Sequence, residues 1–229
     1  MAKIRGKFQN KGISGYDKKK YVWKLIYSHI LGFDVDFGHE ESLNLINAQK
    51  FTEKCTGYIA TGIMLNEKSD QTLFNKCIHA IKADLACGNE VCEALALATI
   101  GNIGSAELAT ELGEIVMYKA FDERKGTPVY VRKRACLTLL SFFRRNRNVF
   151  NKEVWVQGFK DLLSNNNYGL LMAACALIQG TVHTMGRHGF EAIVPMLIKI
   201  LSSINQHATD YFYYQTPCPW LQVKILKIL

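Results

Sequence analysis

Apolar residues recur at helical spacing along almost the whole of this 229-residue chain, and only four prolines interrupt them. Such a repeat places the apolar side chains on one face of a helix, while the alternation typical of a half-buried strand is nearly missing. We therefore predict an all-α protein. The expected helices are 17–31, 40–49, 52–65, 70–86, 89–103, 105–121, 128–146, 151–164, 168–185, 188–205 and 218–229.

Residue types that begin and end helices stand at these boundaries. Thr52, Asp70, Ser105 and Asn151 lie near expected helix starts, where a side-chain oxygen can accept from a first-turn N–H group. Gly32, Gly88, Gly104 and Gly186 lie where helices are expected to end.

Stretches of small and apolar residues return along the chain, among them "GYIATGIML", "ALALATIGNIG" and "AACALIQGTV". Their spacing of roughly 35 to 50 residues is that of HEAT and armadillo helix pairs, so we predict an α-solenoid. Small residues such as Gly57, Gly62 and Ala94 would let neighbouring helices approach closely. We expect one domain over residues 1–229, a fragment of a longer solenoid, with residues 1–15 as a basic and poorly ordered lead-in.

The composition is that of an ordinary folded protein, with 48% hydrophobic and 21% charged residues. We expect no membrane span, because no apolar run approaches the roughly 18 to 20 residues that a span requires. We also expect no secretory signal. Seven cysteines, most of them in apolar helical segments, indicate a reducing compartment. Only Cys87 and Cys92 have a suggestive spacing, and without further ligands nearby we expect no metal site.

Motifs of enzyme chemistry are missing. The chain has no P-loop, nucleophile elbow, zincin helix or dinucleotide fingerprint. Its six histidines are dispersed, and Asp34 and Asp36 lie in an expected loop, where aspartate commonly forms turns. We therefore expect no catalytic residues, no cofactor and no enzymatic activity.

The formal net charge of +8 points to an anionic partner. Two basic clusters contribute to it. One, "RRNR" with Arg144, Arg145 and Arg147, follows "TLLSFF" at a helix end. Cations are favourable at a helix C-terminus, so this cluster needs no ligand to explain it.

The other cluster, Lys18, Lys19 and Lys20, begins a helix, where the macrodipole disfavours cations. A helical wheel places Val22, Leu25, Ile26 and His29 on one face and Lys20, Lys24 and Tyr27 on the opposite one. Lysines beside first-turn N–H groups could bind a phosphate, and Asp17 could cap the helix. A solvated basic face is the alternative, and the residues alone leave both interpretations open.

Several segments resemble the N-terminal trunk of the adaptins, the large subunits of clathrin-adaptor complexes. They are "IRGKF", "GYDKKKYVWKLIY", "LGFDVDFGHEESLNLI", "LALATIGNIGSAELATEL" and "DYFYYQTPCPWLQVKIL", and the resemblance runs from about Ile4 to Leu229. The lysine run and the final segment resemble the alpha subunits more than the gamma subunits.

This resemblance implies an α-solenoid trunk in a complex with beta, mu and sigma subunits, linking membrane cargo to clathrin in endocytosis. It implies a peripheral protein on the cytoplasmic face of the plasma membrane, in coated pits. By the same resemblance, phosphoinositide head groups would be bound by Lys7, Tyr16, Lys18, Lys19, Lys20, Tyr21 and Lys24.

The family also carries a helical segment before "IRGKF", where this chain has only Met1, Ala2 and Lys3. Lipid binding and the recognition of acidic dileucine cargo could therefore be weaker here. The alternative function is a generic helical-repeat scaffold that binds an acidic protein or nucleic acid. We expect no nucleic acid as partner, and the Trp and Asn ladder of peptide-binding importins is missing from the sequence.

Overall fold

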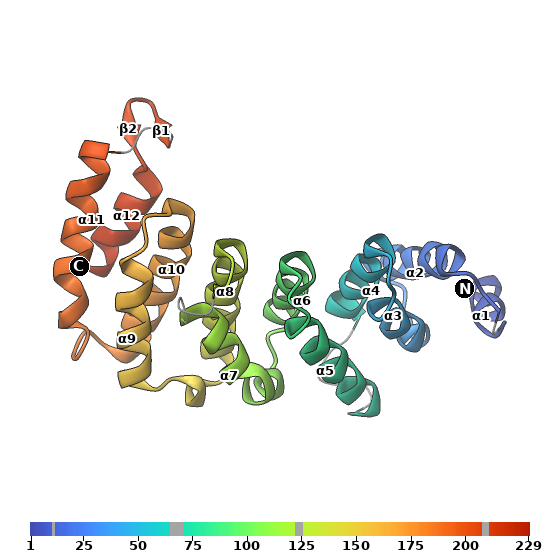
Figure 1. Cartoon of the computed structure of the whole chain (residues 1–229). Coiled ribbons are helices and arrows are strands. Elements are labelled where there is room, and N and C mark those ends of the chain that lie inside the picture. Colours follow the sequence, from blue (N-terminus) through green and yellow to red (C-terminus); the bar gives the residue numbers. More distant parts are fainter. Residues whose placement is uncertain (11, 65–70, 122–125, 208–210) are drawn as a thin grey trace. The chain divides into compact units, whose positions relative to one another are not determined.

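The computed structural model describes residues 1–10, 12–64, 71–121, 126–207 and 211–229 (Figure 1). Its α-helices are α1 (Ala2–Phe8), α2 (Gly15–Ile30), α3 (His39–Ile46), α4 (Phe51–Met64), α5 (Gln71–Leu85), α6 (Glu90–Ile103), α7 (Ala106–Phe121), α8 (Val129–Arg145), α9 (Lys152–Leu163), α10 (Tyr168–Met185), α11 (Val194–His207) and α12 (Pro219–Ile228). Two 3-10 turns, η1 (Arg147–Val149) and η2 (Glu191–Ile193), and a short hairpin of β1 (Phe212–Tyr213) and β2 (Thr216–Pro217) complete it. The prediction of an all-α solenoid is confirmed.

The chain divides into two compact units, Met1–Ser105 and Ala106–Leu229. In the first, α3 packs on α4, α4 also contacts α2 and α6, and α5 packs on α6. In the second, α7 packs on α8, and α10 lies among α8, α9 and α12. The expectation of a single domain stays a prediction, because these units are defined by internal contacts and not by independent folding.

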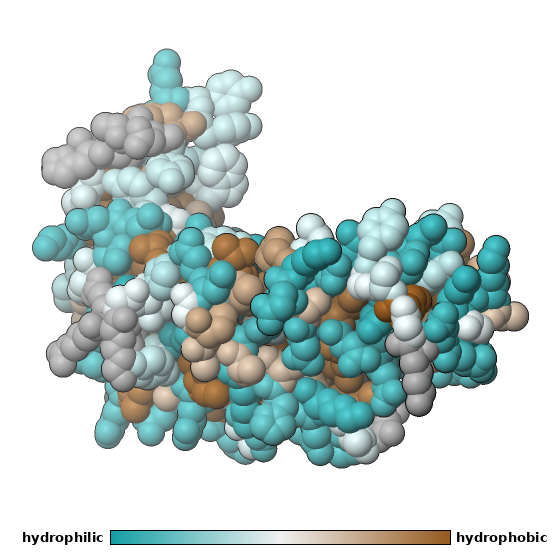
Figure 2. Space-filling view, turned by 45° about the vertical axis from the view of Figure 1, so that its right-hand side comes forward, coloured by the Kyte–Doolittle hydropathy of each residue, from teal (hydrophilic) through white to brown (hydrophobic). Residues whose placement is uncertain are grey.

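Each unit has its own core. In the first, Val22, Leu25 and Ile26 of α2 are buried with Leu45 and Ala60 from α3 and α4. In the second, Trp155 is fully buried among aromatic rings, with its ring centre 5.6 Å from that of Phe143 and 6.0 Å from that of Phe159. The outer surface seen in Figure 2 is mostly hydrophilic, with smaller hydrophobic groups between.

Most helix boundaries agree with the sequence prediction. Gly32, Gly88, Gly104 and Gly186 all have positive φ, the conformation that glycine commonly adopts just after a helix. The Asn151 side chain accepts from Val154 N and caps α9 as expected. Asp70 lies outside the described residues.

Three segments differ from the prediction. Residues 2–8 form α1, which was not predicted. The helix expected from residue 188 begins instead at Val194, because Gly189 has a φ of +89° and Pro195 fits a first helical turn. The hairpin was also missed, since Tyr214 and Gln215 take the left-handed conformation that usually signals glycine or asparagine in such a turn.

One described helix, α10, is long and apolar enough to span a membrane by length and composition alone. This corrects the expectation that no apolar run comes near that length. Half of the helix is buried inside its unit, where Leu170, Ala174 and Ile178 belong to the core. Core helices of soluble proteins have the same length and apolar composition.

Candidate anion-binding site on helix α2

Helix α2 begins with Ser14 as its N-cap, and the Ser14 hydroxyl accepts from Asp17 N at 3.1 Å. The same hydroxyl donates to Asp17 Oδ2 at 3.1 Å. This corrects the prediction that Asp17 itself caps the helix. Asp17 lies in the first turn of α2, where a negative charge stabilises the helix, and its carboxylate is turned back toward Ser14.

A second carboxylate meets this helix end from α4. A Cβ atom built on Gly15 would lie only 2.9 Å from Glu53 Oε1, so Glu53 closes against the first residue of α2. Two acidic groups therefore offset the macrodipole at this end. The Ser14 hydroxyl already accepts from Asp17 N, so a site here would depend mainly on side-chain ammonium and hydroxyl groups.

The lysines spread around the start of α2. Lys20 and Lys24 are exposed and four residues apart, so they share one face, while Lys18 and Lys19 are half-buried. Lys19 Nζ lies 5.6 Å from the centre of the Tyr16 ring, and Lys24 Nζ lies 5.4 Å from that of Tyr21. These pairs make cation–π contacts, which orient the ammonium groups without neutralising them.

None of the predicted site lysines, Lys7, Lys18, Lys19, Lys20 and Lys24, is ion-paired with a described residue. Asp17 and Glu53 lie at the same helix end, yet Asp17 is hydrogen-bonded to Ser14 and Glu53 lies 3.9 Å from Lys50 Nζ. The cluster therefore carries positive charge that the described part of the chain does not neutralise.

Helix α1 brings Lys7 to this end of the unit. Its neighbour Phe8 packs edge-on against Tyr21, with ring centres 6.3 Å apart, and Lys7 itself is exposed. Arg5 of the same helix pairs with Asp36 at 2.7 Å, so its charge is largely offset. His29, predicted on the apolar face of α2, is exposed. Val22, Leu25 and Ile26 are buried and Tyr27 is exposed, as predicted.

The second basic cluster lies at the end of α8. Arg144 and Arg145 are exposed in its last turn, and Arg147 follows in η1. Their place at a helix C-terminus agrees with the interpretation that the dipole accounts for them.

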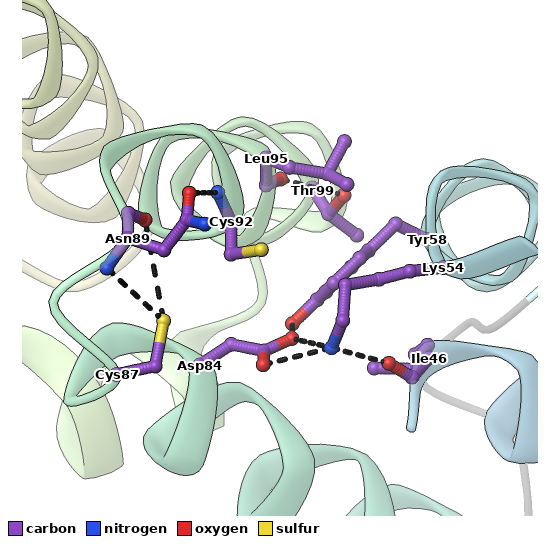
Figure 3. A network of polar contacts seen from close by, with 9 residues as sticks. All are labelled: Ile46, Lys54, Tyr58, Asp84, Cys87, Asn89, Cys92, Leu95 and Thr99. Carbon is purple, nitrogen blue, oxygen red and sulfur yellow. Dashed lines mark hydrogen bonds and ion pairs between the residues drawn. The ribbon is translucent and has the colours of Figure 1, made fainter. Parts of the chain in front are cut away.

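A polar network that the sequence analysis did not predict joins α3, α4 and α5 (Figure 3). Lys54 Nζ lies 2.7 Å from Asp84 Oδ2 and donates to the Ile46 carbonyl at 2.5 Å. Tyr58 Oη donates to Asp84 Oδ2 at 2.7 Å. Burial, together with this hydrogen bond and the Asp84 charge, raises the pKa of the Tyr58 phenol far above its ordinary value. A 30-residue separation between Lys54 and Asp84 left no local pattern that could signal the pair.

The cysteines are free thiols, and burial raises the pKa of Cys77, Cys136 and Cys175 to about 12. Cys87 Sγ accepts from Asn89 N at 3.4 Å in the turn before α6 (Figure 3). The described residues contain no group of three or more His, Cys, Asp or Glu side chains that could hold a metal ion.

Stacked helix pairs with small residues at their crossings define the chain as an α-solenoid protein. It belongs to the adaptin N-terminal region family, which matches residues 1–229. It is 38% identical over 233 residues to the AP-2 complex subunit alpha-1 of Arabidopsis thaliana. The match includes all of this chain and 22% of that protein. It is 36% identical to the AP-2 complex subunit alpha-2 of Dictyostelium discoideum, again with its whole length and 23% of that protein.

A further relative is the AP-2 complex subunit alpha of Schizosaccharomyces pombe, at 35% identity over 231 residues, with all of this chain and 26% of that protein covered. The fold is similar to a chain in a homology model of the full-length AP-3 complex in an intermediate open conformation. That match has a TM-score of 0.68 and 21% identity over 93% of this chain and 34% of the other. This chain thus spans about a quarter of the length of the curated relatives it matches.

Proposed function

We propose that this chain is the trunk of the large alpha subunit of the plasma-membrane clathrin adaptor, a non-enzymatic scaffold in endocytic coat assembly and protein transport. Its family and its similarity to AP-2 alpha subunits support the proposal. Beta, mu and sigma subunits would be its partners, with clathrin and cargo engaged through the whole complex. It would act as a peripheral protein on the cytoplasmic face of the plasma membrane, in coated pits.

We further propose that the lysine cluster binds phosphoinositide head groups. The observation that carries this is that five lysines of α1 and α2 lack ion pairs among the described residues while two carboxylates stand close by. Lysine ammonium groups act as flexible point charges on phosphates, and Tyr16 and Tyr21 would add hydroxyl donors. The site residues are Lys7, Tyr16, Lys18, Lys19, Lys20, Tyr21 and Lys24.

The test is co-sedimentation of the chain with phosphatidylcholine vesicles that contain phosphatidylinositol bisphosphate. Each lysine near an anionic leaflet contributes about 1 kcal/mol, so Lys18→Glu, Lys19→Glu and Lys20→Glu together should weaken binding about 100-fold or more. Higher salt should weaken the parent chain as well. Helical circular dichroism should stay unchanged, since these side chains are not in the core.

A matched control reverses the other basic cluster, with Arg144→Glu, Arg145→Glu and Arg147→Glu. Both variants change the net charge equally, so a simple dependence on total charge would weaken them alike. Binding that survives in the lysine variant would defeat the proposal. Retention of oligonucleotides in a gel at physiological salt would favour the alternative of a nucleic-acid scaffold.

A further inference from the structure

Helix α2 carries apolar side chains on its solvent side as well as in the core. Tyr16, Trp23, Tyr27 and Ile30 follow one another at intervals of seven, four and three residues, so they form one row along the helix. Tyr27 is 65% and Ile30 is 67% exposed, and Phe33, three residues past the helix end, is 61% exposed. The opposite face supplies the core residues Val22, Leu25 and Ile26, so Tyr27 and Ile30 of the outer row take no part in that core.

Lysines flank this row on both sides. Lys20 and Lys24 follow one edge, and Lys19 lies beside Tyr16 on the other, with its Nζ 5.6 Å from the ring centre. The indole Nε1 of Trp23 donates to Thr56 Oγ1 at 3.1 Å, which fixes that ring against α4. Side chains that combine an apolar body with a polar or charged tip are those that settle at a lipid–water boundary.

The acidic groups lie at the two ends of the row. Asp17 and Glu53 stand at its start, and Asp34 follows Phe33, while Asp36 is paired with Arg5. Along the middle of the helix the described surface is therefore cationic and aromatic. An anionic surface with an apolar layer beneath it complements both properties at once.

We propose that α2 lies parallel to an anionic membrane, with Tyr27, Ile30 and Phe33 inserted below the head groups and the lysines on the phosphates. This rests on the proposed function, because the row is continuous with the lysine cluster. The helix has 16 residues and is about 24 Å long, so a head group at its start and an inserted side chain at its end engage the same leaflet. The inserted side chains would add a hydrophobic contribution to membrane binding that salt does not screen.

The test separates head-group binding from insertion. Tyr27→Ser, Ile30→Ser and Phe33→Ser in one chain should leave titration with soluble inositol trisphosphate unchanged, while binding to bisphosphoinositide vesicles falls about tenfold or more. The control is Leu137→Ser, Ile198→Ser and Val223→Ser, three apolar side chains of the second unit that are about half exposed, and it should bind vesicles like the parent. Lipids brominated in the acyl chain should quench fluorescence in the parent and lose that effect in Trp23→Phe.

Equal vesicle binding by the parent and the serine variant would overturn the insertion while leaving the lysine site intact. If the parent does not bind soluble inositol trisphosphate, the proposed lysine site is wrong, and the insertion with it. If the serine variant binds vesicles normally but no longer joins a partner subunit, the row is a protein interface and the insertion is wrong.

Discussion

Lys54 and Asp84 form a nearly buried ion pair, in contrast to the exposed pair of Lys76 and Glu40 in the same unit. The Lys54 and Asp84 side chains are 12% and 13% exposed, while Lys76 and Glu40 are 57% and 68% exposed. Neither pair could be predicted from the sequence, because their partners are 30 and 36 residues apart. Buried charges depend on their partners far more than exposed ones do.

Lys54→Met should therefore destabilise the first unit by about 3 kcal/mol or more, because the buried Asp84 carboxylate would lose its cation and keep the hydrogen bond from Tyr58. Lys76→Met, the matched change in the exposed pair, should cost no more than about 1 kcal/mol. Urea unfolding followed by circular dichroism measures both. Equal losses of unfolding free energy in the two variants would show that the Lys54–Asp84 pair stabilises the unit no more than the exposed pair does.

Helices α3 and α4 cross at Gly57, and the sequence prediction of close helix approach holds there but not at every small residue. A Cβ atom on Gly57 would lie 2.5 Å from Ile46 N and 2.8 Å from Ser42 O, which are backbone atoms that cannot turn aside. On the same helix, a Cβ atom on Gly62 would meet only Thr99 Cγ2, at an ordinary 3.5 Å. The sequence shows that both are glycines, but only the packing shows which of them a neighbour requires.

Gly57→Ala should destabilise the first unit by on the order of 2 to 3 kcal/mol, since α3 would have to move away from α4. Gly62→Ala should be neutral or stabilising by up to about 1 kcal/mol, because alanine is the better helix former and the space is open. Thermal unfolding of the two variants compares them directly. A loss at Gly62 as large as that at Gly57 would contradict the assigned crossing.

Over the whole chain, the fold class followed from periodicity because helix pairs are local structures. For the same reason, the sequence correctly predicted that the lysine run lies near a helix start, that Lys20, Lys24 and Tyr27 face outward, and where most helices end. Two of the features that were missed depend on neighbours distant in sequence. Glu53 reaches α2 from α4, and α1 is held by Ile4 and Phe8 packing into the core of the first unit.

Buried thiols in both units should make the chain sensitive to alkali. The pKa of Cys77, Cys136 and Cys175 rises from 9.0 to about 12 on folding. A pKa that is higher in the folded state gives stability that is complete below pH 9 and is lost as the pH rises toward 12. Each thiol should lower the free energy of unfolding by about 1.4 kcal/mol per pH unit in that range.

Urea midpoints measured from pH 8 to pH 10 test this, below the range in which tyrosine ionisation dominates. A chain with Cys77→Ala, Cys136→Ala and Cys175→Ala should be less stable at pH 8, because cavities replace the sulfur atoms. Its midpoint should nevertheless fall less steeply above pH 9 than that of the parent. Parallel slopes would show that the thiols do not govern the alkaline loss.

A crystal of this chain soaked with inositol trisphosphate would locate the anion itself. We expect its phosphates within hydrogen-bond distance of Lys19 Nζ and Lys20 Nζ at the start of α2, with the Asp17 carboxylate still turned toward Ser14. A head group bound at Arg144 and Arg145 instead, or lysines of α2 that pair with Asp17 and Glu53 and leave no room for it, would contradict the account.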